Sequence, residues 1–115
     1  MSSPFDTLPA PGRHRDITPA DVVARPANVR LIDVREPHEY VGELGHIPGA
    51  ELVPLGTVTQ FLDTWTKDEE LVFVCRSGGR SGRAASAFAE RGFTRTSNML
   101  GGMLRWNDEH RPVER

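Results

Sequence analysis

The chain has 115 residues, of which 37% are hydrophobic and 26% charged, and this length and composition fit one compact domain with a single core. The net charge is −2 and the basic residues form no block of five or six, so we expect neither a nucleic-acid surface nor a polybasic membrane surface. A small anionic substrate needs only a local basic site, and that possibility stays open.

The sequence carries no sign of a membrane span or of a secretory signal. No apolar stretch approaches the roughly 20 residues of a transmembrane helix, and the N-terminus lacks the basic and apolar regions of a signal peptide. We therefore expect a cytoplasmic protein. Its single cysteine, Cys75, cannot form an internal disulfide, so the thiol is either inert filler or part of the chemistry.

The first 15 residues, "MSSPFDTLPAPGRHR", contain three prolines and one glycine and show no sustained periodicity, which predicts a flexible N-terminal arm. A domain over residues 16–110 should follow, with residues 111–115 as a C-terminal tail. The domain begins with helix-start signals, because Thr18 can serve as N-cap and Pro19 suits the first helical position.

Two apolar runs, "VRLIDVR" (29–35) and "LVFVC" (71–75), are typical of strands buried on both faces of a parallel sheet. The other expected elements are a weaker strand at 49–55, a short helix at 57–65, a helix at 79–91 closed by Gly92, a strand at 96–100 and a helix at 101–109. Strands that alternate with helices predict an α/β fold in three layers, with a central, mainly parallel sheet flanked by helices.

Cys75 stands at the carboxyl end of the strongest strand, where open parallel sheets bind ligands. A glycine-rich loop and a helix N-terminus follow, and their N–H groups favour the thiolate. Arg76 and Arg80 can supply charge and donors to an oxyanion leaving group, while Gly78 and Gly79 allow the backbone to approach the sulfur. An inert core cysteine is the alternative, but so polar a loop would seal it poorly.

Four motifs occur in order: "LIDVREPHEY" (31–40), "GHIPGA" (45–50), "CRSGGRS" (75–81) and "NMLGGMLRW" (98–106). Together they resemble the single-domain rhodanese-like sulfurtransferases over roughly residues 16–108. The resemblance implies that Cys75 attacks the outer sulfur of a donor such as thiosulfate, becomes a persulfide, and passes the sulfur to cyanide or a protein thiol. It implies no metal or organic cofactor. The active-site loop would consist of Arg76, Ser77, Gly78, Gly79 and Arg80.

Two features of the loop separate related activities. A basic residue directly after the cysteine, here Arg76, is usual in the thiosulfate-using members of the family that the chain resembles. The loop from Cys75 to Arg80 has the sulfurtransferase length of six residues, one fewer than in the related Cdc25-type phosphatases and arsenate reductases. An alternative function stays open, in which the chain is a persulfide carrier or interaction module that delivers sulfur to a partner protein.

Other polar residues have simpler interpretations. The resemblance implies that Asp33 and Arg35 brace the loop near Cys75, and we favour a structural ion pair over direct catalysis. In the same way, we assign His46 to a turn that leads into the next strand.

The remaining polar candidates lie beside the cysteine or among the histidines. Two roles stay open for Ser77, a hydrogen bond to the sulfur or a helix cap, whereas Ser81 is predicted to be a cap. The histidines at 14, 38, 46 and 110 have no metal-ligand spacing, so no metal is expected.

Overall fold

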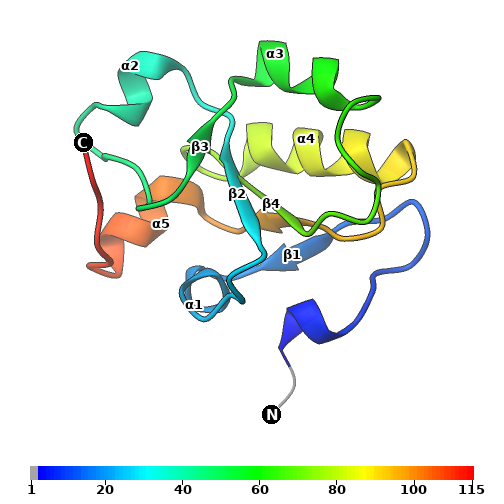
Figure 1. Ribbon diagram of the computed structural model, residues 1–115. Coiled ribbons are helices and arrows are strands. Elements are labelled where there is room, and N and C mark those ends of the chain that lie inside the picture. The colour runs from blue at the N-terminus through cyan, green and yellow to red at the C-terminus, as the bar shows by residue number, and fades with distance from the viewer. Residues whose placement is uncertain (1–2) are drawn as a thin grey trace.

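The computed structural model of the protein describes residues 3–115, and five strands within them form one sheet in the order β1-β5-β4-β2-β3 (Figure 1). All four pairings between neighbouring strands are parallel. The strands are β1 (Arg15–Ile17), β2 (Arg30–Asp33), β3 (Glu51–Leu52), β4 (Leu71–Val74) and β5 (Thr96–Met99). Parallel neighbours bring the carboxyl ends of the two central strands, β2 and β4, to the same edge of the sheet.

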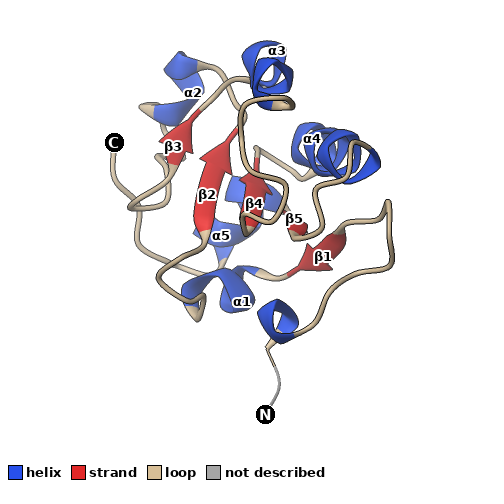
Figure 2. Ribbon diagram, turned by 45° about the vertical axis from the view of Figure 1, so that its right-hand side comes forward, coloured by secondary structure: helices blue, strands red, loops and turns tan. Residues whose placement is uncertain are grey.

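Helices cover both faces of the sheet, as Figure 2 shows. One face carries α3 (Leu55–Val58) and α4 (Gly79–Glu90), while the other carries α1 (Pro19–Val23) and α5 (Gly102–Asp108). A further short helix, α2 (Pro37–Tyr40), follows β2, and 3-10 turns occur at Pro4–Asp6 and Thr59–Phe61. The predicted three-layer α/β architecture is therefore confirmed.

The core consists of two apolar clusters, one on each side of the sheet. All four side chains of β4 are buried, because a central strand of a parallel sheet is covered on both faces. Val72 and Val74 pack towards α1 and α5, whereas Leu71 and Phe73 pack towards α4. Since side chains alternate along a strand, the next residue, Cys75, also lies on the α4 side, in the same cluster as Phe73.

The segment between β2 and β4 differs from its predicted structure. The strand expected at 49–55 is limited to Glu51–Leu52, and the helix expected at 57–65 begins earlier, at Leu55, and continues as the 3-10 turn Thr59–Phe61. Pro54 accounts for the earlier start of the helix, because its ring fixes φ at a value suited to a helix start. The strand therefore ends before Pro54.

Part of the predicted N-terminal arm contacts the domain. Ser3 caps the 3-10 turn that follows it, and Phe5 is buried in the cluster beneath α1 and α5. Arg15 already belongs to β1 and forms an ion pair with Glu70 at 2.9 Å, both side chains being largely buried. The sheet thus begins one residue inside the predicted arm. Met1 and Ser2, the first two residues of that arm, lie outside the described residues.

The predicted C-terminal tail is also attached to the domain. Glu114 forms an antiparallel bridge with His46, and Val113 packs against the apolar cluster on the α5 side. The carbonyl of Pro112 accepts a hydrogen bond from the indole of Trp106 at 2.9 Å. These contacts join the end of the chain to the "GHIPGA" turn.

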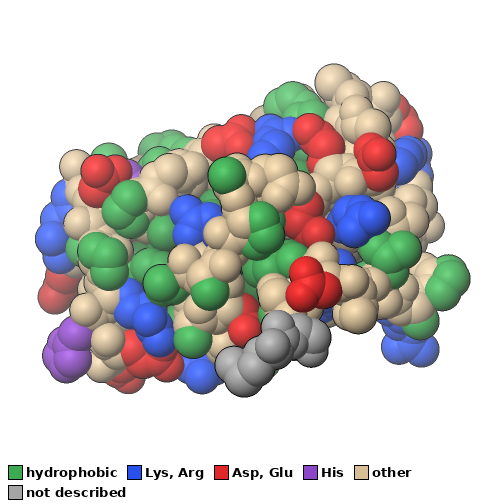
Figure 3. All heavy atoms as spheres, turned by 60° about the horizontal axis from the view of Figure 1, so that its bottom comes forward, with side chains coloured by type: hydrophobic (Ala, Val, Ile, Leu, Met, Phe, Trp, Pro, Cys, Tyr) green, Lys and Arg blue, Asp and Glu red, His purple; other side chains and the backbone are tan. Residues whose placement is uncertain are grey.

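On the face of the molecule that carries α1, acidic and basic side chains are interspersed with apolar ones (Figure 3). This mixed pattern is consistent with the net charge of −2 and the absence of a basic block in the sequence. Among the helices within residues 3–115, none combines the length and the apolar character that crossing a bilayer demands.

Candidate active site

The sulfur of Cys75 lies where β4 gives way to the loop that leads into α4. The residue is 1% exposed. Gly78, at the N-cap of α4, has a left-handed φ of 108°, a conformation that glycine adopts without the strain of a Cβ atom. This turn brings the Gly78 amide to 3.1 Å from Sγ, so that it donates a hydrogen bond to the sulfur.

Ser81 has a different position from the predicted one. The N-cap of α4 is Gly78, so Ser81 lies inside the first turn of the helix, where it is fully buried. Its hydroxyl is 3.2 Å from Cys75 Sγ and 2.6 Å from Oδ1 of Asn98, which comes from β5. The prediction that Ser81 is a cap is therefore wrong, and the hydroxyl is part of the sulfur's environment.

These contacts determine the ionisation of the thiol. Burial raises the pKa of Cys75, but hydrogen bonds from the Ser81 hydroxyl and from the amides of Ser81, Gly78 and Ser77 lower it, and the net pKa lies below the ordinary value. Donors that point at the sulfur stabilise the thiolate relative to the thiol. Ser77 thus contributes through its backbone amide, and its side chain is exposed. The site favours an ionised, nucleophilic sulfur.

Arg80, the last residue of the loop, forms a bidentate ion pair with Glu39 of α2. Its two terminal nitrogens lie 2.7 and 2.8 Å from the two carboxylate oxygens. The hydrogen bonds from Arg80 lower the pKa of Glu39 to about 2. Both terminal nitrogens of Arg80 therefore already have a carboxylate partner, 41 positions away in the sequence, and the local pattern of the loop gives no indication of it.

Asp33 and Arg35 form the ion pair expected at the carboxyl end of β2. Both side chains are 1% exposed, and Nη2 of Arg35 lies 2.8 Å from Oδ2 of Asp33. Arg35 also donates to the carbonyls of Gly45, at 2.7 Å, and Glu39, at 3.2 Å. The guanidinium consequently holds β2, α2 and the "GHIPGA" turn together, and its nitrogens are directed at these partners.

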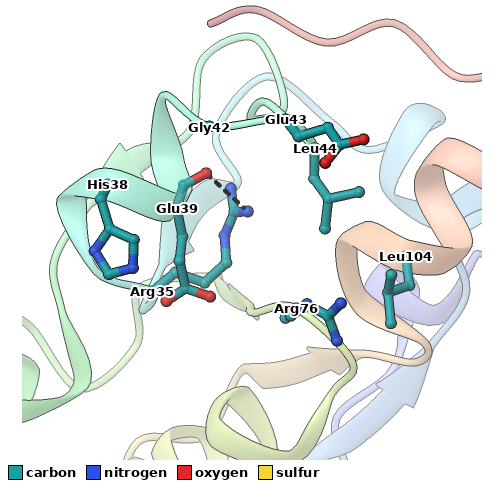
Figure 4. Close-up of a pocket in the computed structure, with 8 residues that line it drawn as sticks. All are labelled: Arg35, His38, Glu39, Gly42, Glu43, Leu44, Arg76 and Leu104. Carbon is teal, nitrogen blue, oxygen red and sulfur yellow. Dashed lines mark hydrogen bonds between the residues drawn. The ribbon is translucent and has the colours of Figure 1, made fainter.

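Arg76 lines a cavity of about 450 Å³ above the loop (Figure 4). Its side chain is exposed and forms no ion pair within residues 3–115. The other lining residues come from the segment after β2 and from α5: Arg35, His38, Glu39, Gly42, Glu43, Leu44 and Leu104. Cys75 directly precedes Arg76 in the chain, but it does not line this cavity itself, and its side chain packs on the α4 side of the sheet.

The N-terminus of α5 fixes the backbone of the loop. The amides of Met103 and Leu104 donate to the carbonyls of Cys75, at 2.9 Å, and Arg76, at 3.0 Å. Gly102 has a φ of 57°, and a Cβ atom there would lie 2.5 Å from the carbonyl oxygen of Cys75. Glycine is thus required for this approach, in agreement with the tight entry that the two successive glycines indicate.

The predicted role of His46 in a turn agrees with its contacts. Nδ1 lies 2.8 Å from the carbonyl of Tyr40, and the two rings pack with their centroids 3.6 Å apart. Within residues 3–115 no group of three or more His, Cys, Asp or Glu side chains is arranged to hold a metal ion.

Comparison with curated proteins gives relatives with related names. The chain is 45% identical over 82 residues to the putative sulfurtransferase YtwF of Bacillus subtilis, covering 71% of this chain and 77% of that protein. It is 34% identical over 79 residues to the thiosulfate sulfurtransferase GlpE of Pseudoalteromonas translucida, covering 69% and 73%. It is 37% identical over 79 residues to the putative sulfur carrier protein YrkF of Bacillus subtilis, covering 69% of this chain but only 42% of that longer protein.

Solved structures and family models agree with these relatives. A rhodanese-like domain protein from Staphylococcus aureus superposes with a TM-score of 0.71 at 29% identity, covering 88% of this chain and 99% of that one. The model of the family described as Rhodanese-like domain matches residues 18–109, which include Cys75 and every loop residue around it. On this evidence the chain belongs to the rhodanese-like domain family.

Proposed function

We propose that the chain is a sulfurtransferase that moves sulfane sulfur from a small anionic donor, such as thiosulfate, to a thiophilic acceptor through a persulfide on Cys75. The observation that carries the proposal is the hydrogen-bonded thiol of lowered pKa at the end of β4, in a chain whose relatives include proteins named sulfurtransferases. The proposed reaction uses no metal or organic cofactor. A free thiol suits a reducing compartment, and we propose the cytoplasm as its location.

In the first half-reaction, the thiolate of Cys75 attacks the outer sulfur of thiosulfate. A bond forms between Sγ and that sulfur, the sulfur–sulfur bond of the donor breaks, and sulfite leaves with the electron pair of the broken bond. A thiolate stabilised in advance by Ser81 and the loop amides needs no separate general base.

In the second half-reaction, cyanide or the thiolate of an acceptor attacks the outer sulfur of the persulfide. The persulfide bond breaks, and Sγ leaves with its electron pair as the Cys75 thiolate. The donors that stabilise the thiolate favour this departure, because a thiol of lower pKa is a better leaving group. Two successive transfers through one covalent intermediate give ping-pong kinetics.

The cavity above the loop suits an anionic donor at one point in particular. Two carboxylates also line it: Glu39, whose charge is offset by Arg80, and the exposed Glu43. Arg76 is a lining cation that, like Glu43, has no ion-pair partner within residues 3–115, so its charge is available to the donor. A guanidinium offers a planar fork of donors that fits the sulfonate oxygens of thiosulfate. Arg76 is therefore the proposed binding residue for the departing sulfite group.

A protein acceptor is the second candidate, and the apolar rim of the cavity favours it. Leu104 of α5 and Leu44 both line the cavity, and Leu104 is 37% exposed. An apolar rim beside the loop that follows the reactive cysteine suits contact with a protein surface more than contact with cyanide. In this version the chain carries the persulfide to a thiol of a partner protein, and thiosulfate:cyanide transfer is incidental.

Intact-mass measurement tests the chemistry directly. After incubation with thiosulfate and removal of small molecules, the chain should carry one additional sulfur atom, and cyanide should remove it with the formation of thiocyanate. Cys75→Ser should gain no sulfur and should retain the folded circular-dichroism spectrum. An unchanged mass of the native chain, or added sulfur in Cys75→Ser, would refute the mechanism.

A phosphatase assay tests the neighbouring activity. The six-residue loop from Cys75 to Arg80 and the engagement of Arg80 by Glu39 leave little room and few donors for a tetrahedral phosphate. Turnover of an aryl phosphate should be absent or far below sulfur transfer. Cys75-dependent phosphatase activity that exceeds sulfur transfer would assign the chain to the phosphatase branch instead.

A further inference from the structure

A chain of polar side chains continues from the sulfur into the sheet. The Ser81 hydroxyl lies between two acceptors, Sγ of Cys75 at 3.2 Å and Oδ1 of Asn98 at 2.6 Å. Asn98 is 6% exposed, and its Nδ2 faces Oδ1 of Asp16, on β1, at 3.5 Å. The site as proposed above makes use of Ser81 but assigns nothing to Asn98.

Counting protons reveals a competition at Ser81. A serine hydroxyl has one proton to donate, so it cannot serve the sulfur and Asn98 Oδ1 at the same time. The contact to Oδ1 is short for a hydrogen bond between oxygen atoms, and an amide oxygen is a good acceptor. Reversing the amide would turn Oδ1 towards the carboxylate of Asp16, so the orientation with Oδ1 at Ser81 is the favoured one.

We propose that Asn98 is a positioning residue that competes with the Cys75 sulfur for the proton of the Ser81 hydroxyl. When the sulfur is a thiolate, the proton turns towards it. When Sγ carries no negative charge, the Ser81 proton turns towards Oδ1 of Asn98. A persulfide places its charge on the outer sulfur, away from Ser81, and Asn98 then receives the hydrogen bond. The competition therefore disfavours the bare thiolate relative to the persulfide.

Other charged groups near the sulfur stay in place when Asn98 is changed. They are Arg76 in the loop, Arg80 of α4 with its partner Glu39 of α2, and Asp33 with Arg35 at the end of β2. None of them contacts Asn98 by a hydrogen bond or ion pair. On β1, Asp16 loses only the long contact from Nδ2 and keeps its contact with His14 at 3.2 Å.

Opposite substitutions at Asn98 make the proposal testable without any sulfur donor. Asn98→Leu removes the competing acceptor and keeps the same branching of the side chain, so the Ser81 proton is left to the sulfur and the pKa of the thiol should fall. Asn98→Asp supplies a stronger, charged acceptor, so the pKa should rise. Ser81→Ala should also raise it. The pKa is read from the pH dependence of thiolate absorbance and of alkylation by iodoacetamide, each against Cys75→Ser as blank.

Below the pKa of the native thiol, the thiolate fraction of Asn98→Leu should exceed the native one about fivefold, as expected for one neutral hydrogen bond gained. The decisive control is the double variant Ser81→Ala/Asn98→Leu. Because Asn98 acts through Ser81, its substitution should leave the thiol pKa of Ser81→Ala unchanged. Since alkylation involves no sulfur transfer, this result is independent of the function proposed above.

Three outcomes overturn the inference. The first is an Asn98→Leu thiol that titrates at or above the native pKa in a folded protein. The second is a shift of the same size in the presence and absence of the Ser81 hydroxyl, which would indicate a general change of packing. The third is a thiol pKa in Asn98→Asp that is unchanged or lower than the native one. If Asn98→Leu fails to fold, Asn98→Asp and its double variant with Ser81→Ala decide in its place.

Discussion

Arg76 differs from Arg80 in having no carboxylate partner within residues 3–115, and it lines the cavity above the loop. We expect Arg76→Ala to lose roughly ten- to one-hundredfold in kcat/KM for thiosulfate, because one charge-assisted contact contributes about 1.5 to 3 kcal/mol. In the proposed reaction, charge builds up on the sulfonate oxygens as sulfite leaves, so kcat should fall as well as affinity. Steady-state kinetics with varied thiosulfate measure both effects.

A matched control for Arg76 is Arg83→Ala, which removes the same charge from an exposed position of α4 outside the cavity lining. Its kinetics should stay close to native. A preformed Cys75 persulfide should still deliver its sulfur to a neutral thiol in Arg76→Ala, since the anionic donor has already gone. Kinetics of Arg76→Ala within about twofold of native would show that Arg76 adds only to the general field.

The residues of the site differ in how far the sequence reveals them. Cys75 and its loop can be predicted because the strand, the glycines and the arginines are consecutive. The predicted helix start at residue 79 agrees with α4 and places Ser81 inside the first turn, but the sequence does not reveal that the Ser81 hydroxyl lies within hydrogen-bond distance of the sulfur. Glu39 and Asn98 come from other elements, and only the folded chain brings them to the loop.

At the scale of elements, the contact between α5 and the active-site loop depends on Gly102. Gly102→Ala should disturb the loop, because the new Cβ would meet the carbonyls of Cys75 and Arg76 at 2.5 Å and the residue has a positive φ. We expect a lower melting temperature and a loss of sulfur transfer larger than the loss of stability alone explains. Gly56→Ala is the control, since its Cβ meets nothing within 4 Å. Native activity in Gly102→Ala would contradict this account.

The ion pair between Glu39 of α2 and Arg80 of α4 makes stability depend on pH. The pKa of Glu39 is about 2 in the folded chain, below its value of roughly 4.3 in an unfolded one. The carboxylate therefore contributes stability that is fully present above about pH 4.3 and is lost as the pH falls through about 2. Both side chains are partly exposed, which keeps the effect small.

Thermal unfolding as a function of pH tests this linkage. Glu39→Gln should melt below the native chain at pH 6, and the difference should shrink as the pH is lowered towards 2. Glu43→Gln, at an exposed position of the same cavity without an ion pair within residues 3–115, should show no such convergence. A difference between Glu39→Gln and native that is constant across this range would assign the loss to packing instead of charge.

For the molecule as a whole, the C-terminal segment is part of the fold. Removing residues 112–115 takes away the acceptor of the Trp106 indole, the bridge to His46 and the apolar contact of Val113. We expect the free energy of unfolding to fall by about 4 kcal/mol, from three lost hydrogen bonds, two of them in the bridge to His46, and one lost apolar side chain that is partly buried. Urea titration measures the loss, and removal of Arg115 alone should have little effect. Equal stability of the two truncated chains would refute the role of the segment.

The overall architecture follows from patterns that can be recognised in the sequence, but its shortest parts do not. Two apolar runs and the alternation of strands with helices predict a parallel sheet in three layers. By contrast, β1 has three residues and α2 has four, too few for any periodicity to emerge. The docking of Phe5 against the core is equally invisible in a segment rich in proline and glycine.

The position of β1 in the sheet has a consequence for the order of assembly. Within residues 3–115 it pairs only with β5, and the paired residues Arg15 and Ser97 are 82 positions apart. During synthesis, β1 therefore cannot pair until β5, the last strand of the sheet, has been made. By contrast, β2 and β4 can pair earlier at a smaller loop-closure cost. As a short strand with one neighbour, β1 should also be the first to open, and its amides should exchange with deuterium ahead of those of β4.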